Sequence, residues 1–113
     1  MSAVRRLADQ PAAAVSTVAG ADAHVAFSGT LDVMQAAAAR SAVAESIGPR
    51  TATLTVDLSD VDRLDAAGLA GVTAPVMSAR RLGIAVAVVP PRTGEARRVA
   101  DQTGVLALLA TVR

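Results

Sequence analysis

The sequence predicts an α/β domain with a mixed β-sheet and crossover helices. Short apolar segments with a period of two alternate along the chain with longer segments of helical period. The predicted elements follow the order ββαβαβαβ, which begins with two strands. At 113 residues the chain is long enough for one domain with one core. We expect a flexible tail over residues 1–11 and a single domain over residues 12–113.

The first half of the chain supplies two strands and a helix. The strands are predicted over Ala12–Val18 and Ala23–Ser28, joined by a loop of hairpin length. The helix is predicted over Asp32–Ile47, with Asp32 or Thr30 as its capping residue and a Gly-Pro pair ending it. Its predicted buried stripe consists of Val33, Ala36, Ala37, Val43, Ala44 and Ile47.

The segment Thr51–Ala70 carries the clearest pattern. Its first half places alternate apolar residues on one face, which is typical of a strand with one side in a core. Those residues are Ala52, Leu54, Val56 and Leu58. An acidic loop is predicted over Ser59–Leu64. Asp65 then precedes small helix-forming residues, so it is the predicted N-cap of a helix over residues 66–82.

The rest of the chain alternates between strand and helix. Pro75 lies inside the second helix and should kink it. Ile84–Val89 is continuously apolar, which predicts a central strand covered on both faces. A third helix is expected over Thr93–Gln102 and a last strand over Val105–Val112. The free edge of that strand could pair weakly with a second copy of the chain.

Composition excludes several classes of function. The formal charge is +1 and Phe27 is the single aromatic residue, so no basic, aromatic face for nucleic acid is expected. The chain has no cysteine, which excludes disulfides and thiol catalysis and fits a reducing compartment. No apolar stretch is long enough to span or enter a membrane, and the N-terminus lacks a signal segment. We therefore expect a soluble, cytoplasmic protein.

The titratable residues do not predict an enzyme. Asp57, Asp60, Asp62 and Asp65 lack the spacing, the glycine and the distal glutamate of a calcium loop, so neither a metal nor another cofactor is expected. His24 is the single histidine, and its place on the polar face of a strand predicts an exposed, structural residue. No nucleophile elbow accompanies it.

An ordered set of short motifs gives a more specific expectation. V-D-L-S-D-V-x-x-L-D-x-x-G-L begins at Val56, Gly29-Thr30-Leu31-Asp32 precedes it, and Thr103-Gly104-Val105 follows it. This set resembles the signature of STAS domains, which include bacterial anti-sigma-factor antagonists and sulfate-transporter tails. The resemblance covers roughly residues 12–112. The final helix of that family would be missing, because the chain ends after the last predicted strand.

The resemblance implies a protein-binding regulatory domain that docks an anti-sigma kinase of the ATPase fold. The implied binding residues lie in the loop and at the start of the second helix, namely Asp32, Ser59, Asp60, Asp65, Ala66, Ala67, Gly68 and Leu69. In antagonists of this family a hydroxyl directly after the aspartate is phosphorylated, and the added charge expels the partner. Ala66 and Ala67 occupy the phosphoacceptor positions here, so no phosphorylation is expected.

Two alternatives remain open at this level. STAS domains also serve as subunits that bind the ATPase of a lipid-type ABC transporter, or as parts of larger signalling assemblies, where no phosphoswitch is needed. Gly68 and Gly71 have two explanations as well. They provide either a flat surface for a partner or room for close packing inside the domain.

Overall fold

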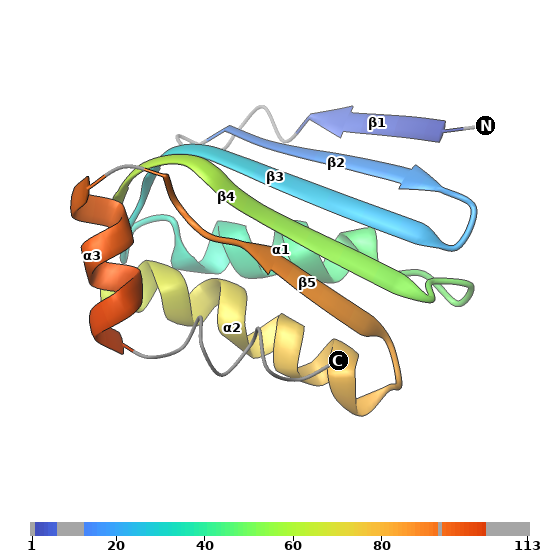
Figure 1. The fold of residues 1–113 in the computed structure, drawn as a ribbon. Helices are drawn as coiled ribbons and strands as arrows, with labels where there is room; N and C mark the ends of the chain where they lie inside the picture. Colours follow the sequence, from blue (N-terminus) through green and yellow to red (C-terminus); the bar gives the residue numbers. More distant parts are fainter. Residues whose placement is uncertain (1, 7–12, 93, 104–113) are drawn as a thin grey trace.

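The structure, a computed structural model, describes residues 2–6, 13–92 and 94–103 (Figure 1). The strands are β1 (Ser2–Arg6), β2 (Ala13–Ala19), β3 (Asp22–Leu31), β4 (Thr53–Leu64) and β5 (Ala85–Val89). The helices are α1 (Ala36–Ser46), α2 (Ala66–Arg81) and α3 (Gly94–Thr103).

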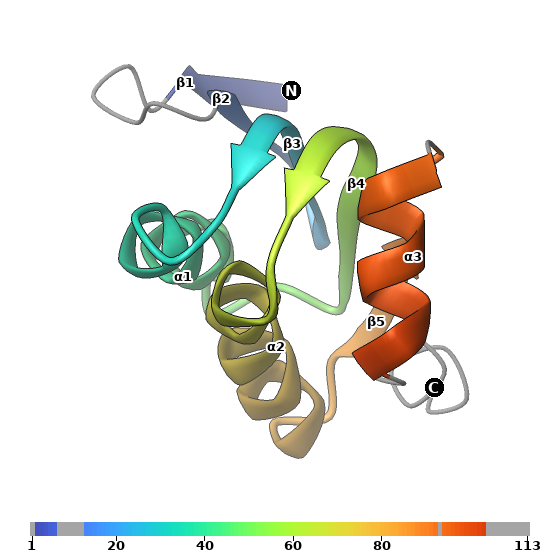
Figure 2. The same ribbon diagram turned by 90° about the vertical axis from the view of Figure 1, so that its left-hand side faces the viewer.

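The strands form one mixed sheet in the order β1-β2-β3-β4-β5. The pairs β1–β2 and β2–β3 are antiparallel, whereas β3–β4 and β4–β5 are parallel and joined through α1 and α2. Both crossover helices cover the same face of the sheet, and α3 lies against β4 and α2 (Figures 1 and 2). The predicted α/β class with a mixed sheet is confirmed.

The N-terminus differs from the prediction. Residues 2–6, expected to be part of a flexible tail, form β1 and pair with β2. An edge strand is stabilised by backbone hydrogen bonds to its neighbour, and the side-chain pattern used for the prediction does not report these bonds.

The predicted acidic loop over Ser59–Leu64 is also wrong, because β4 continues through it as a strand. The pairing with β3 shifts between Ala26 and Ser28 and again between Gly29 and Thr30. Each shift adds one residue to β4 relative to β3, as in a β-bulge, which bends a strand and changes the phase of its side chains. The alternation of buried residues therefore breaks after Leu58, which made the segment resemble a loop.

The predicted central strand is an end strand of the described sheet. In β5 the side chains of Ala85, Ala87 and Val89 are exposed and that of Val86 is buried, so one face alone is covered. A short run of alanine and valine fits either environment, and the sequence pattern could not distinguish them. The last predicted strand, with its proposed dimer edge and the missing family helix, lies outside the described residues.

Of the two crossover helices, α2 agrees with its prediction and α1 does not. Helix α2 has the predicted bounds within one residue, and its predicted stripe is buried. That stripe consists of Leu69, Val72, Val76 and Ala79. Helix α1 begins four residues later than predicted, and its buried residues are Ala39, Ala42, Val43 and Ser46. Alanine is so frequent in this segment that it does not mark which face is buried.

The core fills the space between the sheet and the two crossover helices. Its strand residues include Val25 and Phe27 from β3 with Leu54, Val56 and Leu58 from β4, all 3% exposed or less, and α3 adds Ala96 and Ala100. Valine, leucine and alanine dominate it, as the near absence of aromatic residues predicts. Because β3 and β4 are the best-packed strands, the segments at their carboxyl ends start from a rigid base.

Candidate functional site

The candidate site lies where β3 and β4 end side by side. The chain leaves β3 at Leu31 and β4 at Leu64, and these two residues are paired in the sheet. The turn after β3 and the first turn of α2 therefore meet at one end of the molecule, which faces the viewer in Figure 2. We call this the tip surface, formed by Asp32, Val33, Met34, Asp65 and Ala66.

Asp65 joins the two halves of the tip surface. Its backbone is extended (φ −120°, ψ 172°), and its Oδ1 accepts a hydrogen bond of 2.7 Å from the amide of Gly68. Its Oδ2 accepts a second bond of 3.2 Å from the amide of Val33. The Asp65 amide donates to the carbonyl of Leu31 at 3.2 Å. The predicted N-cap is confirmed, and the same carboxylate also fixes the turn after β3.

Asp32 lies beside the start of α2 but does not cap α1. The N-cap of α1 is Gln35, which makes no side-chain cap bond. Asp32 Oδ1 instead accepts a bond of 3.0 Å from the Met34 amide, and its carbonyl accepts one of 2.9 Å from Gln35. This local turn replaces the first predicted turn of the helix, since aspartate side chains readily stabilise such turns.

The two glycines of α2 serve close packing. A Cβ atom on Gly68 would lie 2.1 Å from the Leu31 carbonyl oxygen, and one on Gly71 would lie 2.4 Å from that of Ala36. Both glycines are buried, and Leu69 is 1% exposed. The sequence analysis placed Gly68 and Leu69 among the partner-binding residues. Because both are buried, they are not available for direct contact with a partner.

Two exposed apolar residues on the tip surface were missed by the sequence analysis. The side chain of Val33 is 63% exposed and that of Met34 is 80% exposed. Val33 had been assigned to the buried stripe of a helix that in fact begins three residues later. Met34 was not part of that stripe. An apolar residue outside the predicted buried stripe could have indicated an exposed apolar surface.

The alanines that follow Asp65 are placed unequally. Ala66 is exposed, whereas Ala67 is half-buried. Both belong to the first turn of α2, whose free amides carry the positive end of the helix dipole.

Ser59 and Asp60 contact other groups than the tip surface. Asp60 forms an ion pair with Arg92, whose Nε donates a bond of 3.3 Å to the Ser59 carbonyl. The Ser59 amide donates to Asp57 Oδ1 at 2.9 Å. The two contacts of Arg92 join β4 to the segment before α3, whereas the Ser59–Asp57 bond lies within β4.

Asp57 has a perturbed acidity on the same strand. Partial burial raises its pKa, but the hydrogen bonds from the side chain and amide of Ser59, with the charges of His24 and Arg92, outweigh burial and lower the pKa. The carboxylate is therefore ionised at neutral pH. His24 is exposed as predicted.

The described residues limit the chemistry of the site. Within residues 2–6, 13–92 and 94–103, no three His, Cys, Asp or Glu side chains are grouped so that they could hold a metal ion. None of the helices in these ranges is both long and apolar enough to cross a membrane. The tip surface thus combines exposed apolar side chains, a helix start without charged side chains, and two carboxylates that accept hydrogen bonds from backbone amides.

The mixed sheet, with a parallel strand pair that carries a turn and a capped helix at one end, is the α/β architecture that the resemblance to STAS domains implies. The family model described as "Mlab, STAS domain" matches residues 14–110. The chain belongs to the STAS domain family. No curated protein matches the sequence significantly.

The solved structures with a similar fold include three different proteins. The anti-sigma-factor antagonist SpoIIAA in its unphosphorylated form is 16% identical, with a TM-score of 0.52 over 90% of this chain and 84% of that one. SLC26A9 is 13% identical, with a TM-score of 0.54 over 79% of this chain and 17% of that one. Mglu is 22% identical, with a TM-score of 0.60 over 68% of this chain and 19% of that one. The chain thus corresponds to about a fifth of Mglu and of SLC26A9.

Proposed function

We propose that this chain is a regulatory domain that docks an anti-sigma kinase of the ATPase fold through the tip surface and has no phosphoswitch. The observation that carries the proposal is the exposure of Val33 and Met34 in the turn that is hydrogen-bonded to Asp65, the residue before Ala66. Exposed apolar side chains that are grouped on one surface favour association with another protein. Methionine also adapts its flexible side chain to the shape of a partner.

The backbone of the tip surface is already ordered in the free chain. Asp65 bonds to the amides of Val33 and Gly68, and the close approach of Gly68 to Leu31 fixes the position of α2. A surface that needs no ordering on binding loses less conformational entropy, so a small apolar patch can still give useful affinity.

The absence of a hydroxyl at the helix start supports a permanent binding state. Ala66 and Ala67 cannot accept a phosphoryl group, whereas the antagonists that this sequence resembles carry serine or threonine there. A phosphate at this position would add about −1.5 to −2 charges to the tip surface, and the cost of desolvating these charges against an apolar partner face would oppose docking. The proposed role is binding without turnover.

The direct test is capture of the purified kinase with this chain as bait, in the presence and absence of ATP. We expect equal capture in both conditions and no gain of phosphate by mass spectrometry. Stoichiometric phosphorylation, or release of the kinase by ATP, contradicts the proposal. So does ATP turnover by the chain alone that Asp65→Asn abolishes.

Point variants separate the tip surface from the rest of the molecule. Ala66→Asp and Met34→Asp should each reduce capture at least about tenfold, since a desolvated, unpaired charge opposes docking, while the melting temperature stays nearly unchanged. Ala21→Asp is the matched control, because Ala21 is exposed in the β2–β3 hairpin at the other end of the sheet (Figure 1). Equal loss of capture in all three variants contradicts docking at the tip.

A second candidate partner is the ATPase of a lipid-type ABC transporter. The same alanine pair favours it, because a constitutive subunit needs no phosphoacceptor. Capture of that ATPase in place of the kinase, with the same sensitivity to Met34→Asp, would decide for this alternative.

A further inference from the structure

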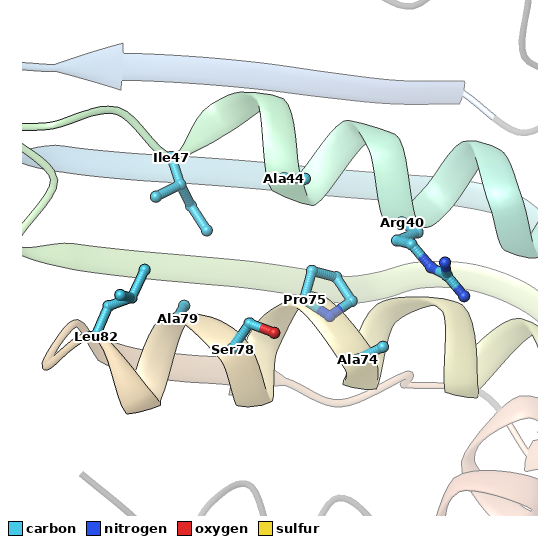
Figure 3. A pocket seen from close by; sticks show the side chains of 8 residues that line it. All are labelled: Arg40, Ala44, Ile47, Ala74, Pro75, Ser78, Ala79 and Leu82. Atoms are coloured by element: carbon cyan, nitrogen blue, oxygen red, sulfur yellow. The ribbon is translucent and has the colours of Figure 1, made fainter.

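A groove runs between α1 and α2 (Figure 3), and none of its lining residues belongs to the tip surface. Its volume is about 510 Å³, which lies within the range of about 300–1,000 Å³ that is usual for small-molecule sites. Ala44 of α1 faces Pro75 and Ala79 of α2 across it. These short side chains leave space between the helices that longer ones would fill.

The groove has one polar end and one apolar end. Arg40 extends from α1 over one end, and Ile47 and Leu82 lie at the other (Figure 3). Leu82 is 75% exposed although it is a leucine. Arg40 has no hydrogen bond or ion pair with any residue in the described ranges. The polarity of the groove therefore matches a molecule with an anionic head and an aliphatic tail.

The length of the groove suits a small molecule. Eight residues line it. Arg40 and Ile47 lie seven positions apart along α1, so the groove extends about 10 Å at ~1.5 Å per residue. This length suits a short aliphatic chain.

We propose that the groove between α1 and α2 binds a medium-chain aliphatic carboxylate, with its carboxylate at Arg40 and its tail between Ile47 and Leu82. The guanidinium donates to the carboxylate oxygens, a pairing that favours arginine. The tail covers the exposed parts of Ala44, Ile47 and Leu82, and the removal of this apolar surface from water supplies the remaining affinity. This site is independent of the proposed docking function.

The experiment is titration of the full chain with sodium octanoate, followed by calorimetry and by NMR shifts of the groove methyl groups. We expect saturable binding with the largest shifts at Ala44, Ile47 and Ala79. Octyltrimethylammonium, which has the same tail and the opposite charge, should bind at least about tenfold more weakly. Shifts without saturation, or equal binding of the two amphiphiles, overturn the proposal.

Two matched pairs of variants test the assigned ends of the groove. Arg40→Gln should weaken octanoate binding about five- to tenfold, because it removes a charge-assisted hydrogen bond in a partly solvated place. Arg98→Gln, at an exposed position of α3, should leave octanoate binding unchanged. Ala44→Leu fills the groove from an exposed position and should abolish binding, whereas Ala37→Leu, exposed on the same helix, should leave it intact. No difference within either pair overturns the assignment.

Discussion

Gly68 sets how closely the start of α2 approaches the turn after β3. Its amide is the donor to Asp65 Oδ1, and its missing side chain leaves room for the Leu31 carbonyl. The obstacle to a larger residue is main chain at the end of a buried strand, which cannot move aside as the tip of a flexible side chain can. At the scale of one residue, this glycine determines where the tip surface lies.

Gly68→Ala should therefore destabilise the protein by about 3 kcal/mol, since overpacking against fixed backbone exceeds the gain in helix propensity. Urea unfolding measures the difference. Gly94→Ala is the control, because nothing lies within 4 Å of a Cβ atom at that position, and it should stay within about 1 kcal/mol of the parent. Equal stability of the two variants would falsify the packing argument.

At the scale of elements, one carboxylate couples a helix to a strand that lies far away in the sequence. Asp65 satisfies the Gly68 amide at the start of α2 and the Val33 amide in the turn that follows β3. An ordinary N-cap stabilises its own helix alone. Here the cap also holds the two exposed apolar residues in place, so stability and partner binding depend on the same side chain.

Asp65→Ala should cost about 1–2 kcal/mol, the usual range for a lost N-cap, and should weaken capture of the partner as well. Asp62→Ala removes an exposed carboxylate from the preceding strand, and its effect on stability should be within about 0.5 kcal/mol. Thermal unfolding and the capture assay on both variants give the comparison. A stable Asp65→Ala variant with unchanged capture would show that the bridge has no role.

At the scale of the whole molecule, the core lies mainly on one face of the sheet, the face that the two crossover helices cover. Both crossover helices pack on the same face of the sheet, and β4, which lies between β3 and β5, supplies buried leucines to it. Most of the stability should therefore come from contacts between β3, β4 and the two helices, and little from apolar residues elsewhere on the surface.

Two leucines with opposite exposure test this distribution. Leu54 is 1% exposed in β4, and its replacement by alanine should cost about 2–5 kcal/mol because a cavity remains. Leu82 is 75% exposed after α2, and Leu82→Ala should change stability by no more than about 0.5 kcal/mol. Chemical unfolding of both variants measures the contrast. A large loss for Leu82→Ala would mean that the rim of the groove is part of the core.

The linear sequence was enough to predict the class of fold, the helix at Ala66–Arg81 and the cap at Asp65. These depend on periodicity and on contacts between residues a few positions apart, which a linear pattern records. It also determined that no hydroxyl follows the cap. The tertiary structure alone decided that the acidic segment after Leu58 is a bulged strand, that Gly68 and Leu69 are buried, and that Val33 and Met34 are exposed. These properties arise from the pairing of β4 with β3 and from the docking of α2 against the end of β3. Such contacts join residues about thirty positions apart, and no local pattern encodes them.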